Sequence, residues 1–149
     1  MPITRSVWTD DDGSGTTGTV LNNAELQKIY NNIDGQIASG VWTPVDASGA
    51  GLVFTFASGA WHKHDRMVYF TLQVIYPSNV NGLAAKIGGL PYVIQSNAGG
   101  AHGYGPGMAW YVTANGTVIS PLNRTTGLPH INGDMSGSNF IVSGSYLTT

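Results

Sequence analysis

The densest cluster of polar side chains lies at residues 61–66, with the sequence WHKHDR. It holds two of the four histidines of the chain, His62 and His64. On an extended strand, side chains two positions apart point the same way, so these two imidazoles could bind one metal ion. The third ligand would have to come from Asp65, His102, His130 or another copy of the chain. No recognised metal motif is present, and the turn chemistry of Asp65 favours a polar hairpin over a metal site at His62 and His64.

Carboxylates are the other side chains that could do chemistry. In the region predicted below to be β-structure, they are Asp46, Asp65 and Asp134. A depolymerase acting on glycans needs two carboxylates about 5–10 Å apart, and the sequence gives no reason to pair any two of these. No Gly-x-Ser-x-Gly elbow is present. The chain has no cysteine, which excludes thiolate metal sites and cysteine nucleophiles. We therefore expect no enzymatic activity and no cofactor.

A glycine-rich stretch between Asn97 and Trp110, NAGGAHGYGPGMAW, predicts a long surface loop. It lacks the Gly-Lys-Ser/Thr of a phosphate-binding loop and does not lead into a helix. Exposed aromatic rings on such a loop can stack on sugars or contact proteins, and packing in the core or at its rim is the alternative. The later segment GLPHINGDMSG adds two polar candidates. The predicted binding residues, at one end of the fold, are His102, Tyr104, Trp110, His130 and Asn132.

The composition limits the partners. Only 9% of the 149 residues are charged, the formal net charge is −2, and Lys and Arg together number six. Contacts with phosphates need clustered cations, so we expect no nucleic-acid partner. No apolar run reaches the 18 residues of a membrane span, and the N-terminus lacks the apolar core of a signal peptide. A polar surface of Gly, Ser, Thr and Asn fits neutral partners such as sugars or other protein chains.

These side chains must be positioned mainly by β-strands. From position 41 onward, short β-prone runs are separated by Gly, Asn and Pro about every ten residues, which is typical of an antiparallel β-sandwich, jelly-roll-like in arrangement. The run 66–76 alternates clearly, with one apolar face and one mixed face that includes Tyr69 and Ile75. Asn115-Gly116 predicts a two-residue hairpin turn. We therefore predict a β-sandwich head over residues 41–149.

The N-terminal part has a different character. Residues 10–19 are acidic and then rich in Gly and Thr, which predicts a flexible arm over residues 1–20. Residues 21–40 predict one α-helix, with Asn22 as its cap and Gly40 at its end. Its apolar stripe comprises Leu26, Ile29, Tyr30, Ile33 and Ile37. Because such a short helix is marginal alone in water, it must either pack on the sandwich or pair with copies of itself.

Several short motifs follow one another in a characteristic order. After the arm DDGSGTTGT and the segment LNNAEL come Trp42-Thr43-Pro44, Gly59-Ala60-Trp61, Ile87-Gly88-Gly89-Leu90-Pro91 and Ser143-Gly144-Ser145-Tyr146. This order resembles that of bacteriophage virion proteins, in particular the C-terminal β-domains of tail fibres and tail-tip receptor-binding proteins. The third motif has one glycine more than the family pattern. The resemblance spans most of the chain and assigns the WHKHDR stretch to a structural hairpin.

The resemblance implies a non-enzymatic virion protein that forms a homotrimer. The arm and the helix would attach it to other virion proteins, and the β-domain would bind a glycan or protein on the host surface. The mixed face with Tyr69 and Ile75 is the expected surface between copies. Three alternatives stay open: a capsid decoration or head-fibre protein, a free carbohydrate-binding module that is monomeric, and a glycan depolymerase.

Overall fold

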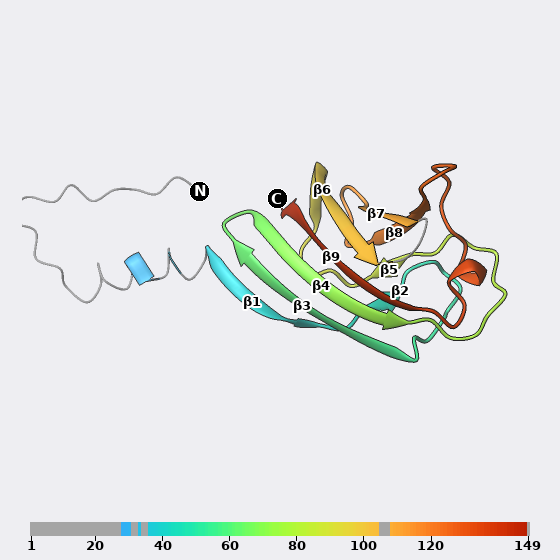
Figure 1. Ribbon diagram of the computed structural model, residues 1–149. Coiled ribbons are helices and arrows are strands. Elements are labelled where there is room, and N and C mark those ends of the chain that lie inside the picture. Colours follow the sequence, from blue (N-terminus) through green and yellow to red (C-terminus); the bar gives the residue numbers. More distant parts are fainter. Residues whose placement is uncertain (1–27, 31–32, 34–35, 105–107, 149) are drawn as a thin grey trace, which may run out of the picture. The chain divides into compact units, whose positions relative to one another are not determined.

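The computed structural model describes residues 28–30, 33, 36–104 and 108–148, and for residues 96–104 the backbone alone. The chain divides after Ile37, and the larger unit, Ala38–Thr149, contains nearly all of the β-structure (Figure 1). Its elements in chain order are β1 (Ile37–Trp42), β2 (Val45–Asp46), β3 (Phe56–His64), β4 (Met67–Ile75), β5 (Ile87–Gly88), β6 (Ile94–Tyr104), β7 (Met108–Val112), β8 (Ile119–Asn123), the short 3-10 helix η1 (Asn132–Met135) and β9 (Asn139–Thr148).

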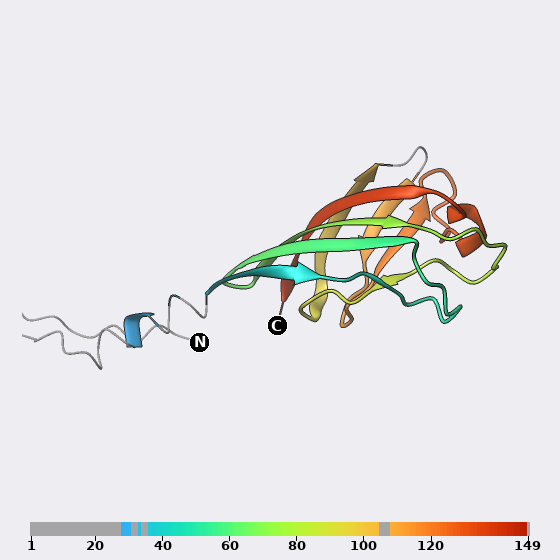
Figure 2. The ribbon, with the colours of Figure 1, turned by 90° about the horizontal axis from the view of Figure 1, so that it is seen from below.

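The strands form one hydrogen-bonded order, β1-β3-β4-β9-β6-β7-β8-β5-β2. Strands β1 and β2 stand at opposite ends of this order, yet only residues 43 and 44 separate them in the chain. The three residue steps from Trp42 to Val45 span at most about 11 Å, so the sheet must curl until its two ends come close. The result is two antiparallel layers, with β1, β3, β4 and β9 in one and the remaining strands in the other (Figures 1 and 2).

The mainly β architecture with antiparallel layers agrees with the prediction. The jelly-roll arrangement differs, because a jelly roll divides eight strands between two separate sheets, whereas here β9 pairs with β6 and joins the two layers. No helix in the described part of the chain has the length and hydropathy needed to cross a membrane.

Strand β4 holds the centre of its layer and shows the predicted alternation. It pairs over its full length with β3 on one side and with β9 on the other. Its inward residues, Val68, Phe70, Leu72 and Val74, are buried, whereas Tyr69 is exposed on the opposite face. Full burial of each such side chain stabilises the fold by about 1.5–3 kcal/mol.

An aromatic cluster fills the space between the layers. The ring of Tyr76 lies 4.9 Å from that of Phe54 and 5.9 Å from that of Phe140, and Trp110 packs against Phe140 at 5.7 Å. Burial, and to a lesser degree the negative charge of Asp46, raises the pKa of the Tyr76 phenol. Tyr76 therefore stays neutral and serves as a core side chain.

Two glycines make room for two tryptophans where β1 meets β3. A Cβ atom at Gly40 would lie 2.9 Å from the Trp61 ring, and one at Gly59 would overlap the Trp42 indole. Each indole therefore lies against the backbone of a glycine on the neighbouring strand. These reciprocal contacts fix β1 against β3 and leave no space for a larger residue at either glycine.

The predicted helix over 21–40 is wrong at its C-terminal end. Residues 28–30 and 33 are helical, and the Gln36 amide donates to the Ile33 carbonyl in a turn, but Ile37 begins strand β1. Gly35 and Gly40 weaken a helix here, and the outward and inward positions of β1 alternate as in a strand. Ile37 therefore does not belong to the helical stripe. Leu26 and the arm over 1–20 lie outside the described residues.

The predicted glycine-rich loop is also wrong over residues 97–104, because these residues form most of β6. Their backbone pairs with β9, with Gly100 opposite Ser145 and Ala101 opposite Gly144. Small residues on both strands let the backbones pair, and this pairing overrides the poor strand propensity of glycine.

The turn at Asn115-Gly116 joins β7 and β8 as predicted, but within a longer loop over 113–118. Asn115 has a positive φ of 58°, and its amide donates to the Ile94 carbonyl. The loop is thus tied to β6 as well as to the strands that it connects.

Candidate functional site

The predicted binding residues fall into different environments. His102 and Tyr104 lie on β6, and their side chains are outside the described part of the structure. Trp110 is only 5% exposed and packs in the aromatic cluster, so it is a core residue and not a surface platform. His130 and Asn132 lie together at the end of the sandwich near η1. The structure therefore does not bring the five residues into one accessible site.

Asn132 is fully buried and joins three loops. Its side-chain amide donates to the Ser48 hydroxyl at 2.9 Å and to the Asn81 side-chain oxygen at 3.1 Å. These partners lie in the loops that follow β2 and β4, and Asn132 itself begins η1. Its predicted contact with a ligand does not fit this burial. Asn132 instead holds the three loops in a fixed arrangement.

Asp46 anchors the first of these loops. One carboxylate oxygen accepts hydrogen bonds from the amide and the hydroxyl of Ser48, at 2.9 and 2.6 Å, and the other accepts from the Leu52 amide at 3.0 Å. Burial raises the pKa of the Asp46 carboxyl, but the hydrogen bonds, led by those from Ser48, outweigh it, and the pKa lies below the usual value of 3.8. Asp46 is therefore an ionised structural acceptor and is poorly suited to be a general acid, which needs a raised pKa.

His130 and Asp134 form the other polar contact at this end. The His130 Nδ1 atom lies 3.2 Å from the Asp134 carboxylate, which also accepts a hydrogen bond from the Ile131 amide. The His130 side chain is only 14% exposed, so it presents little surface to a ligand. The loop end, defined here as residues 47–55, 76–86 and 124–138, instead exposes aliphatic side chains: Val53, Val80, Leu83, Leu128 and Ile131.

The two histidines of WHKHDR lie on β3 with the predicted common orientation. His62 pairs with Tyr69 and His64 with Met67 across the β3–β4 hairpin, and both histidines are exposed on the same face. Asp65 occupies the turn with a positive φ of 54°. Among the described residues, no three His, Cys, Asp or Glu side chains gather as a metal site would require. The hairpin prediction for this stretch is confirmed.

These histidines belong to the outer face of the layer formed by β1, β3, β4 and β9. Here, the outer face means the outward positions of these strands within residues 38–75 and 139–148, and none of them is Asp, Glu, Lys or Arg. Large apolar side chains stand exposed on it: Val41 (85%), Phe56 (45%), Tyr69 (53%) and Ile141 (55%). The predicted mixed face with Tyr69 is therefore part of a larger uncharged surface.

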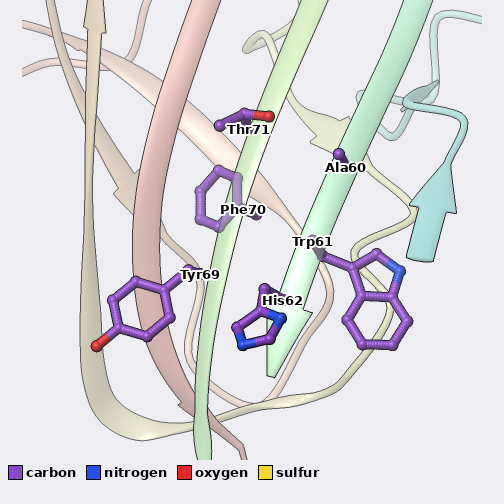
Figure 3. Close-up of a pocket in the computed structure, with 6 residues that line it drawn as sticks. All are labelled: Ala60, Trp61, His62, Tyr69, Phe70 and Thr71. Carbon is purple, nitrogen blue, oxygen red and sulfur yellow. The ribbon is translucent and has the colours of Figure 1, made fainter. Parts of the chain in front are cut away.

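Two shallow hollows mark the outer face. The larger, about 330 Å³, is lined by Val41, Phe56, Ser58, Gly59, Ala60, Thr71, Leu72, Gln73 and Ile141. The smaller, about 250 Å³, is lined by Ala60, Trp61, His62, Tyr69, Phe70 and Thr71 (Figure 3). The hollows share Ala60 and Thr71, so the small residues at the centre of the face lie lower than the large side chains around them.

The outer face could not be located from the sequence alone. The segments 52–61 and 139–148 both read as strands, and either could place one apolar residue outward. Only the register shows that Phe56 and Ile141 lie on the same face as Tyr69, because β4 stands between their two strands. Strand order, which the sequence does not give, was the missing information.

The fold is similar to part of a known protein. The crystal structure of the Dettilon tailspike protein (gp208) matches this chain with a TM-score of 0.56 and 14% sequence identity. The match covers 74% of this chain, which spans only 23% of the tailspike chain. No protein-family model matches the sequence, and no curated protein matches it. At this identity the likeness concerns the fold.

Proposed function

We propose that this chain is a non-enzymatic structural domain of a bacteriophage tail, which forms a homotrimer and contacts the host surface. The observation that carries the proposal is the shared fold with a tailspike protein over 74% of this chain. The order of motifs from Trp42-Thr43-Pro44 to the closing strand supports the same assignment independently of the fold. A virion location and attachment through the N-terminal segment follow from this proposal.

The loop end is the proposed host contact. Asp46 holds the first of its loops and Asn132 links all three by hydrogen bonds, and a pre-organised surface loses little conformational freedom on binding. Val80 is almost fully exposed, and Leu83 and Ile131 lie near it, because the Gly133 amide donates to the Asn81 carbonyl and the Asn132 amide to that of Leu83. Aliphatic side chains fit an apolar protein surface better than a sugar, which is usually bound by aromatic rings.

The carboxylates support a role without catalysis. Asp46 is held as a low-pKa acceptor, Asp65 lies in the hairpin turn, and Asp134 is hydrogen-bonded within η1. A glycosidase needs one carboxyl with a raised pKa beside a second that is ionised. The environment of Asp46 is the opposite of what a glycosidase acid requires.

The proposal is tested on the purified chain of 149 residues with two readouts. Light scattering should give a mass near three times 15.7 kDa. Labelled protein should adsorb to host cells, and Val80→Asp should reduce this adsorption at least about tenfold, or 1.4 kcal/mol. Val93→Asp is the matched control, because Val93 lies away from the loop end, near the β3–β4 turn. The adjacent Ile94 pairs with Thr148, and the Thr148 amide donates to the Arg66 carbonyl beside that turn.

The outcomes separate the alternatives. A monomer in solution would overturn the homotrimer and favour a lone carbohydrate-binding module. Binding to capsid shells in place of tails would favour the decoration protein. Equal adsorption by Val80→Asp and wild type would remove the loop end as the host contact.

A further inference from the structure

We infer that the outer face of the β1–β3–β4–β9 layer packs against another copy of this chain. The inference rests on the proposed homotrimer and adds the surface through which its copies meet. It follows from the chemistry, the relief and the extent of the outer face.

The chemistry of the outer face is that of a surface covered in the assembled state. Monomeric proteins rarely expose large continuous apolar patches, and such patches commonly mark interaction sites. Here Val41, Phe56 and Ile141 border one hollow, and Tyr69 borders the adjoining one. The cationic side chains of the hairpin lie elsewhere: Lys63 points inward, 5.7 Å from the Tyr92 ring, and Arg66 donates hydrogen bonds to the Gln95 side chain and the Thr148 carbonyl.

The relief of the outer face suits packing against a similar surface. Small residues, Ser58, Ala60 and Thr71, form the floor of the hollows, and large apolar residues stand at their margins. Projecting side chains of one copy can therefore enter the hollows of another. Close packing of this kind, together with depletion of charge, characterises the centre of protein interfaces.

The extent of the outer face is adequate for a stable contact. Four strands about 4.8 Å apart and nine residues of about 3.3 Å each give a flat area of about 600 Å². This is of the same order as the about 800 Å² that each partner contributes to a standard interface. Strand β1 also ends the strand order of the described residues and carries neither charge nor proline, the usual devices that keep an edge strand from pairing.

A copy of the same chain fits this face better than a charged partner. In a homotrimer, the outer faces of the three copies would meet around the three-fold axis. A face without Asp, Glu, Lys or Arg meets its copies without repulsion between like charges, and it offers no salt bridges to a charged protein. The apolar residues Ile29, Tyr30 and Ile33, also exposed, precede β1 directly in the sequence. Apolar residues thus occur both in the segment before β1 and on the outer face.

The test compares Thr71→Lys with Thr125→Lys in the full-length chain. Both threonines are exposed, but Thr71 lies at the centre of the outer face and Thr125 in the turn after β8. Symmetry would bring the new lysines of several copies close together, so Thr71→Lys should raise the concentration at which the oligomer dissociates at least about tenfold. Thr125→Lys should leave it unchanged, as measured by light scattering over a dilution series.

A second measurement covers the case in which Thr71→Lys does not fold. Because the chain has no cysteine, Thr71→Cys and Thr125→Cys each introduce one thiol. In the oligomer, the thiol at position 71 should react with a maleimide at least about tenfold more slowly than that at 125. If the wild type is trimeric but position 71 is neither protected nor sensitive to charge, the outer face is not the interface and the homotrimer stands. A monomeric wild type would overturn both the outer-face interface and the proposed homotrimer.

Discussion

Asp46 shows how one side chain controls the shape of the loop end. Its two carboxylate oxygens accept three hydrogen bonds from Ser48 and Leu52, and Ser48 in turn accepts one from Asn132. The carboxylate therefore also affects the loop that contains Asn132. Asp46 orients the Ser48 hydroxyl by accepting its hydrogen bond, and the same hydroxyl accepts a hydrogen bond from Asn132.

We expect Asp46→Asn to destabilise the fold in a pH-dependent way. An amide nitrogen cannot accept one of the hydrogen bonds, and at pH 7 the loss should be about 1.5 kcal/mol, the lower value for a hydrogen bond to a charged group. Because the pKa of Asp46 is lowered in the folded state, its stabilisation is complete above the ordinary pKa of 3.8 and is lost as the pH falls through the folded-state pKa. Urea unfolding at several pH values measures this.

The difference in unfolding free energy between wild type and Asp46→Asn should therefore narrow as the pH falls from 7 toward 2. Ser48→Ala serves as the control, since it removes one hydroxyl donor and keeps the titrating carboxylate. A difference that stays constant over this pH range would show that Asp46 does not contribute through its charge.

The role of Asn132 could not be predicted from the sequence. A polar residue in a segment with Gly and Pro reads as an exposed loop residue, and ligand contact was the natural hypothesis. Its burial depends on Ser48, which lies 84 positions away, and on Asn81, 51 positions away. Sequence patterns report local periodicity, so a buried hydrogen-bonding hub formed by three distant loops leaves no local signal.

The pairing of β1 with β3 depends on the Trp–Gly contacts. We expect Gly59→Ala to destabilise the fold by about 1–3 kcal/mol, because the new methyl group would overlap the Trp42 indole and force it out of its place. The matched control is Gly82→Ala, where a Cβ atom meets nothing within 4 Å. This control should change the stability by no more than about 0.5 kcal/mol.

Chemical denaturation of both variants checks this expectation. Tryptophan fluorescence provides a second readout, since displacement of Trp42 should alter the emission of the Gly59→Ala variant in the folded state. Equal stabilities for the two variants would show that the β1–β3 contact tolerates an added methyl group and that Trp42 does not fix β1.

A strand could be predicted where its own sequence alternates between apolar and polar residues. It could not be predicted where only pairing with a neighbouring strand makes the segment a strand. β4 follows from its pattern, because every second residue from Val68 to Val74 is apolar and buried. Residues 97–104 of β6 were predicted as a loop, since their glycine-rich sequence has little intrinsic strand preference, and only their pairing with β9 makes them part of a strand. Ile37 fits the helical spacing of the apolar residues before it, but it belongs to strand β1, which pairs with β3.

The division of the chain after Ile37 separates the β-domain from the segment that precedes it. Apart from Ile37, which begins β1, the strands, the aromatic cluster and the loop end belong to the unit Ala38–Thr149. The exposed apolar residues Ile29, Tyr30 and Ile33 precede it. The architecture of the β-domain was accessible from the spacing of strand-like runs and turns, whereas the order of its strands, which creates the outer face, depends on contacts between distant segments.

We expect a variant that begins at Ile37 to fold but to assemble more weakly. Its core stays complete, so the free energy of unfolding per chain should change by less than about 1 kcal/mol, near the range of surface changes. Loss of the apolar stripe should raise the dissociation concentration of the oligomer at least about tenfold, because the outer face alone would then hold the copies together. Circular dichroism and light scattering measure the two effects separately.

The result also shows whether the N-terminal segment or the outer face contributes more to the association of the copies. If the truncated protein is folded and monomeric at all concentrations, the N-terminal segment supplies most of the association. If it remains as strongly associated as the full chain, the segment is free for attachment to another virion protein and the outer face carries the assembly. Loss of folding would contradict the independence of the β-domain, since no buried core residue among those that the structure describes lies before position 38.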